Sequence, residues 1–504
     1  MKKIISYTLI LWTFCTLALG QNSPINLVEN AQTGMKKENL GSSINSGFSE
    51  TAPLISPDGK MLFFSRGGHP HNIGDSKQQD IWYAELQKDG TWGAAKNIGS
   101  PLNNDAPNYV ASISPDGKAM LVGNLYKPDG SYGGSGMSIT YLTERGWAIP
   151  KPVIIRNYYT NATEVSYRLS IGQNVLLLSL ARDDSFGSND LYVSFILPDS
   201  TWSEPKNLGS LINTLGEESA PFLAADNTTL YFASNGRPGY GETDVFITHR
   251  LDDTWMNWSE PQNLGPEVNG KGTDLHYTIS VDGDFAYTVS TEHSFGDKDI
   301  FRIATSAATK PKPVVLVYGK VSDDQTQLPL GSSIEFASET NNQLQALVGS
   351  DAKDGSFKAF LPAGQKYQLK ASAQGYAVFQ ELLDVSETNA YREVEMNIQL
   401  ASLQKMVAQK EVSKQENLQQ TTHTATDKVY TSTNYRTDLY VPSVFFDPNT
   451  AQIDNYGQET LAQVLDFLVD NPTFVIEIQG HTDNVGSTTD NNTLSEQRAL
   501  QIKQ

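Results

Sequence analysis

A tryptophan recurs at an almost constant interval through the middle of the chain, and this regularity constrains the possible folds more than any other feature. The intervals are 55, 55 and 56 residues, between Trp92, Trp147, Trp202 and Trp258. An Asp–aliphatic–aromatic tripeptide recurs with the same period, at Asp80-Ile81-Trp82, Asp190-Leu191-Tyr192, Asp244-Val245-Phe246 and Asp299-Ile300-Phe301, with the degenerate Met137-Ser138-Ile139 in the remaining repeat. An Asn–aliphatic–Gly tripeptide follows three of the tryptophans, starting at Asn97, Asn207 and Asn263. A fixed period of this length indicates copies of one small unit stacked on one another.

Turn signals between β-rich runs show what each unit contains. They occur at Ser56-Pro57-Asp58-Gly59, Ser114-Pro115-Asp116-Gly117 and Asp282-Gly283. Four short strands per unit with an aromatic landmark are typical of a β-propeller. The pattern resembles the PD40 subset of WD40-like repeats, as in TolB-type propellers. We therefore predict an all-β propeller of about five blades over residues 21–310, with blades that begin near Ala52, Val110, Val165, Ala220 and His276.

The N-terminal segment carries one landmark without the rest of a repeat. Asn39-Leu40-Gly41 matches the end of a unit that has no beginning. We expect this segment to supply the outer strand of the last blade and so to close the ring. The recurring tryptophans are interpreted as packing between blades, with a ligand cage as the less favoured alternative.

Two further regions follow the repeats. Lys310-Pro311-Lys312-Pro313 predicts a stiff linker, because each proline fixes its own φ and restricts the residue before it. Residues 314–400 resemble the carboxypeptidase-regulatory-like domain, on the strength of Val317–Val321, Asp354–Phe357 and Gly375-Tyr376. That resemblance implies a small β-sandwich without catalytic groups, acting as a spacer or adhesion module. Residues 401–437 are polar and predict a flexible linker.

A cluster of polar residues near the C-terminus carries the strongest functional signal. The alternating run Phe474–Gln479 predicts a strand, and Gly480-His481-Thr482-Asp483 follows directly. Thr493 and Glu496 have the spacing of a capping box, which predicts a helix beginning there, with Arg498 about one turn into it. A loop containing Asn491 can then bring Asp483 and Arg498 together. Such a pair suits a zwitterion, with its ammonium group on the aspartate and its carboxylate on the guanidinium.

These residues resemble the OmpA-like peptidoglycan-binding domain, over residues 438–504. The resemblance rests on Gly480–Asp483, Asn491 and Leu494–Ala499, and it implies an α/β fold that is incomplete at Gln504. It also implies that Asp483 and Arg498 hold the ammonium and carboxylate of diaminopimelate in the stem peptide, assisted by Asn491 and Thr482. The alternative is that Asp483 merely ends a strand and Arg498 is a solvated helix residue.

The N-terminus is typical of a secretory signal peptide. Met1-Lys2-Lys3 precedes an apolar run, and Ala18-Leu19-Gly20 supplies small residues for cleavage, so residues 1–20 are expected to be removed. A membrane anchor is disfavoured because the run is short. Lipidation of Cys15 is a second alternative, disfavoured by the bulky Trp12-Thr13-Phe14 before it. Cleavage after Gly20 leaves no cysteine for a disulfide or a metal site.

The net charge and the absence of two catalytic sequence motifs argue against several classes of function. The formal net charge of −20 argues against nucleic acid and anionic lipid as partners. The chain contains neither a Gly-x-Ser-x-Gly elbow nor a His-Glu-x-x-His motif, and His69 and His71 lie in a glycine-rich stretch. A pair of catalytic carboxylates, as in a glycosidase, is not excluded, because an acidic chain has many carboxylates that could form such a pair. We therefore predict no enzymatic activity, no cofactor and no metal.

Together these features predict a scaffold of a Gram-negative-type envelope, in the periplasm and associated with the outer membrane. Its C-terminal domain would bind the peptidoglycan stem peptide through diaminopimelate, and its propeller would dock outer-membrane or periplasmic proteins. The domain order resembles the peptidoglycan-anchoring component of the type IX secretion machinery. The alternative is an enzyme that processes or senses glycans or muropeptides in the propeller pocket.

Overall fold

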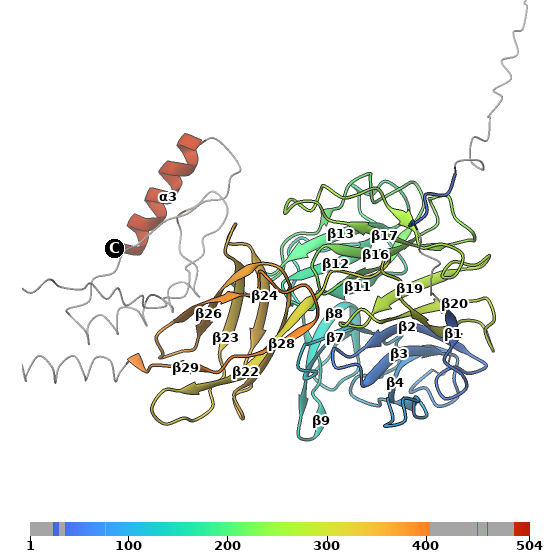
Figure 1. The fold of residues 1–504 in the computed structure, drawn as a ribbon, viewed down its shortest axis with the longest axis horizontal. Helices are drawn as coiled ribbons and strands as arrows, with labels where there is room; N and C mark the ends of the chain where they lie inside the picture. The colour runs from blue at the N-terminus through green and yellow to red at the C-terminus, as the bar shows by residue number, and fades with distance from the viewer. Residues whose placement is uncertain are drawn as a thin grey trace, which may run out of the picture.

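The fold is largely β, as a computed structural model of the chain shows (Figure 1). The structure describes residues 24–29, 36–75, 77–403, 451, 461 and 488–503. The predicted signal peptide, nearly all of the predicted linker over residues 401–437 and most of the OmpA-like region lie outside the described residues. The described C-terminal part is the helix α3 (Thr488–Lys503).

Residues 37–304 form five antiparallel sheets, one for each predicted repeat, which we call the repeat sheets. The first contains β2 (Ser49–Ile55), β3 (Met61–Gly67), β4 (Gln79–Glu85) and β5 (Lys96–Asn97). The second contains β6 (Val110–Ile113), β7 (Ala119–Tyr126), β8 (Tyr132–Thr143), β9 (Gly146–Trp147) and β10 (Lys151–Pro152). The third contains β11 (Ser166–Leu169), β12 (Val175–Leu180), β13 (Asp190–Phe195) and β14 (Lys206–Asn207). The fourth contains β15 (Glu218–Leu223), β16 (Thr229–Ser234), β17 (Asp244–His249) and β18 (Gln262–Asn263), and the fifth contains β19 (Asp274–Ile279), β20 (Phe285–Ser290), β21 (Asp299–Ala304) and β1 (Lys37–Asn39).

The fifth repeat sheet is completed by the N-terminal segment. β1 pairs antiparallel with β21, and Asn39 lies opposite Phe301. The pairing predicted from Asn39-Leu40-Gly41 is therefore confirmed. Strands separated by more than two hundred residues share this sheet, so its stability depends on a contact between the two ends of the repeat region.

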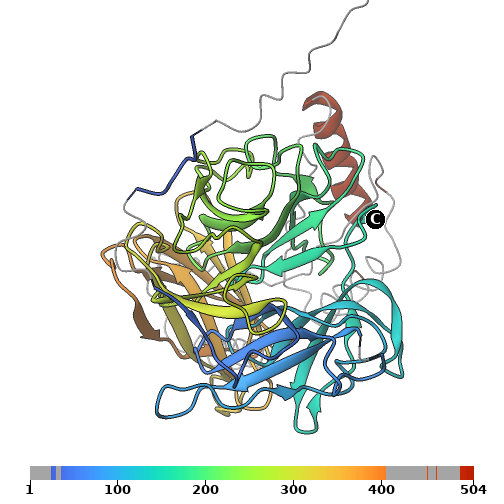
Figure 2. The same ribbon diagram turned by 90° about the vertical axis from the view of Figure 1, so that its right-hand side faces the viewer.

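The first strand of each repeat sheet contacts the first strand of the next. In order these strands are β2, β6, β11, β15 and β19, and β19 in turn contacts β2. In Figure 2 the repeat sheets lie around a common centre. The five first strands therefore surround one shared space, which we call the axial space.

A repeated hydrogen-bond network explains the Asp and Asn landmarks. In the third repeat sheet Asn207 donates from Nδ2 to the buried carboxylate of Asp190 at 2.8 Å. Asn213 donates to the carbonyl of Leu191 at 3.0 Å and accepts from its N–H at 2.7 Å. The same three positions are hydrogen-bonded alike in other repeat sheets: Asp80, Asn97 and Asn103; Asp244, Asn263 and Asn269; Asp299, Asn39 and Asn45. In these four sheets the landmarks are thus polar groups, with the aspartates buried, that tie the outer part of the sheet to its third strand.

Asn213→Ala should lower the free energy of unfolding by about 3 kcal/mol, because the N–H and C=O of Leu191 then stay buried without partners. Urea unfolding followed by tryptophan fluorescence measures the change. Asn161→Ala, which removes an exposed amide, should change the free energy by less than about 0.5 kcal/mol. Equal losses in both variants would show that the network does not stabilise the sheet.

The recurring tryptophans pack between neighbouring repeat sheets. Trp92 lies in one apolar cluster with Tyr287 of the fifth sheet, and the two rings meet edge to face at 6.3 Å. Trp202 and Trp258 lie in clusters that likewise contain residues of two sheets, and Trp147 packs against a cluster with residues of the first and second sheets. Their interpretation as packing residues is confirmed.

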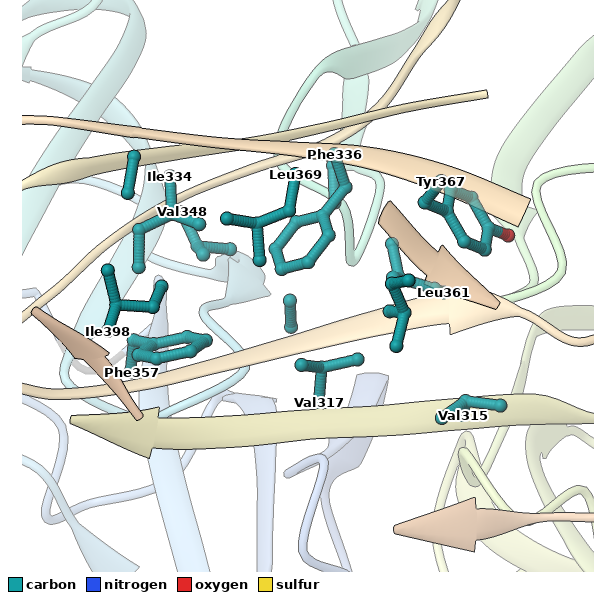
Figure 3. Close-up of a cluster of buried hydrophobic side chains, with 14 of the residues drawn as sticks. Val315, Val317, Ile334, Phe336, Val348, Phe357, Leu361, Tyr367, Leu369 and Ile398 are labelled. Atoms are coloured by element: carbon teal, nitrogen blue, oxygen red, sulfur yellow. The ribbon is translucent and has the colours of Figure 1, made fainter. Parts of the chain in front are cut away.

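Residues 314–400 form two more sheets around one apolar core (Figure 3). One contains β22 (Val314–Asp323), β25 (Ser356–Pro362), β28 (Arg392–Glu395) and β29 (Ile398–Leu400), and the other β23 (Ser333–Ser338), β24 (Leu344–Gly349), β26 (Lys366–Ser372) and β27 (Phe379–Asp384). Along β26, Tyr367, Leu369 and Ala371 are fully buried and alternate with Gln368 and Lys370, which are not. This alternation directs one face of each sheet into the shared core. We call residues 314–400 the two-sheet unit.

The two-sheet unit lies against one edge of the repeat sheets (Figure 1). This edge, the turn edge, consists of the turns that join the first strand of each sheet to its second. The contacts include Leu347 N–H to Gly172 O at 2.8 Å, Asn174 Nδ2 to Leu344 O at 2.7 Å, Asn227 Nδ2 to Gln345 O at 3.1 Å, and the Lys118–Asp351 ion pair. Backbone and side-chain hydrogen bonds therefore fix the unit to three successive repeats.

Candidate functional site

Helix α3 carries two of the four residues for which the sequence predicts ligand contact, Asn491 and Arg498. Arg498 is partly buried. Seven residues separate the two positions, which is close to two turns of α-helix, so both lie on one side of α3. Asp483 and Thr482 lie outside the described residues. The pairing of Asp483 with Arg498 stays a prediction.

The predicted start of this helix is wrong. We expected the helix to begin at Thr493 and Asn491 to lie in the preceding loop, but α3 begins at Thr488 and includes Asn491. Arg498 is consequently near the third turn of the helix, not the first. The capping-box spacing misleads because Thr488, Thr489 and Asp490 are also acceptable at a helix N-terminus.

A second candidate site lies in the axial space near the turn edge. A cavity of about 50 Å³ is lined by residues of all five first strands. The corresponding position, two residues before each turn, holds Leu54, Ser112, Arg168, Phe222 and Thr278. Pro311 and Lys312 of the segment that leads to the two-sheet unit also line it.

Sequence reasoning did not single out Arg168. Within Ser166–Leu169 alone it looks like an ordinary polar residue of a strand. The available signal is the comparison of repeats, since the other four copies of this position hold uncharged residues. The structure shows Arg168 only 8% exposed, although it lines a cavity.

The two histidines of the glycine-rich segment belong to an aromatic cluster. His69 packs edge to face on Trp82 at 4.7 Å and on Phe48 at 5.2 Å. Burial, with smaller effects of Arg66 and His71, lowers the pKa of His69. Within the described residues no three His, Cys, Asp or Glu side chains gather in a way that could hold a metal ion. No helix in the described part of the chain has the length and apolarity needed to span a bilayer.

Comparison with protein families identifies the C-terminal region. Residues 445–504 match the OmpA family. This match covers the predicted ligand residues Thr482, Asp483, Asn491 and Arg498. No curated protein matches the chain.

Comparison with solved structures gives only weak likenesses. 3-Chlorocatechol 1,2-dioxygenase from Rhodococcus opacus 1CP is 11% identical over 18% of this chain and 61% of its own, with a TM-score of 0.15. Wild-type catechol 1,2-dioxygenase from Acinetobacter radioresistens is 10% identical over 18% of this chain and 52% of its own, and its TM-score is also 0.15. The chain thus spans between half and two thirds of the length of these dioxygenases. α-L-Arabinofuranosidase from Lactobacillus brevis is 12% identical over 53% of this chain and 92% of its own, with a TM-score of 0.34. At such scores the likenesses carry no argument about fold or activity.

Proposed function

We propose that the protein is a non-enzymatic scaffold of the cell envelope, anchored to peptidoglycan by its C-terminal region and docked to another envelope protein by its repeat sheets. The observation that carries the proposal is the match of residues 445–504 to the OmpA family, which implies association with peptidoglycan. The periplasm is the compartment in which such a domain meets the wall.

The ligand of the anchor is the diaminopimelate side chain of the stem peptide. Its distal end carries one ammonium and one carboxylate, which suit Asp483 and Arg498 respectively. The position of Asn491 on the same side of α3 as Arg498 supports a shared role for these two residues. Thr482 would add a hydroxyl beside Asp483.

The repeat sheets are proposed to form a five-bladed β-propeller. Three observations support this: the five antiparallel sheets, the contacts of their first strands in cyclic order, and the pairing of β1 with β21. In a closed ring each first strand has a neighbour on both sides. The N-terminal segment would then act as a clasp, because its strand β1 joins the last repeat sheet and so holds the two ends of the repeat region together.

The edge opposite the turn edge is the proposed docking face. The two-sheet unit occupies the turn edge, so a protein partner has better access to the loops that join the second and third strands. Phe186 and Phe295 lie in such loops and are 47% and 59% exposed, and Leu215 in a neighbouring loop is 89% exposed. Exposed aromatic and aliphatic side chains are typical of protein contacts. The resemblance of the domain order to the type IX secretion anchor favours an outer-membrane protein as the partner.

The alternative function, an enzyme acting on glycans or muropeptides in the axial space, finds less support. The cavity near the turn edge has a volume of about 50 Å³, enough for roughly three or four waters. A sugar ring with its hydroxyl groups is larger. Pro311 and Lys312 further restrict access from this side.

The purified chain should pellet with diaminopimelate-type sacculi and should release no soluble muropeptides from them. Co-sedimentation measures binding, and chromatography of the supernatant measures turnover. Free diaminopimelate should compete, while free lysine at the same concentration should compete less because it lacks the distal carboxylate. Turnover that tracks the protein through purification would instead support the enzyme.

A further inference from the structure

The axial space contains a buried positive charge that no described carboxylate balances. Arg168 is 8% exposed, and no carboxylate of the described residues acts on its charge. Its Nη1 donates to the carbonyl of Ala111 at 2.9 Å, and its guanidinium lies 5.2 Å from the ring centre of Phe222. Burial lowers the pKa of Arg168 to about 10, so the side chain is still charged at neutral pH.

The donors of Arg168 exceed the acceptors around it. A guanidinium has five N–H groups, and among described residues the single recorded acceptor is the Ala111 carbonyl. Asp226, next in sequence to the lining residue Ala225, is already engaged: it accepts from the backbone N–H groups of Thr228, Thr229 and Lys312 and from the Thr229 hydroxyl. Asp226 is therefore not available as a partner for Arg168.

The lining of the cavity favours an anion. Its described residues include two cations, Arg168 and Lys312, and no carboxylate, in a chain whose net charge is −20. The hydroxyl of Thr278 donates to Pro53 O at 3.2 Å, and that of Ser112 has Ala111 O at 2.6 Å and Leu169 O at 3.0 Å as acceptors, so neither hydroxyl hydrogen is free for a ligand. The charged side-chain donors left for a ligand are those of Arg168 and the ammonium of Lys312, of which only Arg168 is buried.

We propose that this cavity is a binding site for a small carboxylate, held by the Arg168 guanidinium in the axial space. A buried charge without a partner is costly, and a bound carboxylate would supply the missing partner. The planar fork of a guanidinium matches a carboxylate in shape, and the volume admits a molecule of roughly formate or acetate size. The site is independent of the peptidoglycan anchor.

Titration calorimetry with sodium formate tests the proposal, with sodium chloride at equal ionic strength as the ion control. The full chain should bind formate, and Arg168→Met should weaken binding at least roughly tenfold. Arg156→Met is the matched control, because Arg156 is an exposed arginine already paired with Asp199 at 2.6 Å, and it should bind like the unchanged protein. Equal binding in all three proteins would overturn the proposal, as would a preference for chloride over formate.

A measurement on the unchanged protein guards against misfolding of Arg168→Met. A crystal structure determined from formate-containing solution should show planar density within hydrogen-bond distance of Nε or Nη2 of Arg168. Water alone at that place would overturn the proposal whatever the variant does. A melting temperature of Arg168→Met close to that of Arg156→Met would show that lost binding is not lost folding.

Discussion

Arg498→Ala is expected to weaken binding to diaminopimelate-type peptidoglycan roughly 30-fold or more, and to affect lysine-type peptidoglycan much less. Lysine at the same place in the stem peptide keeps the ammonium and lacks the carboxylate. It would therefore contact Asp483 and leave Arg498 without a ligand group. Losing one side of a partly desolvated, charge-assisted contact typically costs about 2–5 kcal/mol, which gives this factor.

Asp483→Ala, in contrast, should weaken binding to both wall types, since both supply the ammonium group. Co-sedimentation of each variant with each type of sacculus gives four measurements. Arg145→Ala removes an exposed arginine of the second repeat sheet and should leave all binding unchanged. Equal losses on the two walls for Arg498→Ala would mean that the arginine supports helix α3 and does not contact the ligand.

Deleting residues 21–45 is expected to lower the free energy of unfolding by on the order of 5 kcal/mol and to cause aggregation. The deletion removes β1, so the backbone of β21 becomes an open edge. It also removes Asn39, which donates to the buried Asp299 carboxylate at 2.7 Å, and Asn45, which satisfies both backbone groups of Ile300. Each buried polar group left unpaired costs about 1–3 kcal/mol.

Thermal unfolding and size-exclusion chromatography measure this effect. Deleting only residues 21–35 is the matched control, because it keeps β1 and removes the short contact of Asn26 and Val28 with Asn263. The shorter deletion should remain monomeric and melt within a few degrees of the full chain. A monomeric 21–45 deletion with unchanged melting would contradict the clasp proposed for the N-terminal segment.

The repeat sheets could be predicted from sequence because their landmarks are the residues of the repeated hydrogen-bond network themselves. Asn39 illustrates this: a lone tripeptide indicated a missing outer strand, since the asparagine is needed wherever a buried aspartate such as Asp299 begins the third strand. The pairing of asparagine with aspartate involves residues of one small sheet, so it produces a short pattern that can be recognised in the sequence.

Two features could not be predicted for different physical reasons. The start of α3 was misplaced because capping preferences are weak, and the residues from Thr488 to Thr493 offer several similar starts. Arg168 was overlooked because its importance arises only when five strands distant in sequence meet around one space. Neither local propensity nor periodicity contains that information.

The way β22 lies beside β29 determines how the two-sheet unit would respond to mechanical force. The two strands are parallel, with Val321 opposite Ile398 and Asp323 opposite Leu400. The chain enters at the start of β22 from the repeat sheets and leaves after β29 toward the C-terminal region. Tension between an anchored wall and a docked partner would thus pull the two strands lengthwise past each other. In that geometry their hydrogen bonds share the load simultaneously and do not open one at a time, so the unit should resist extension.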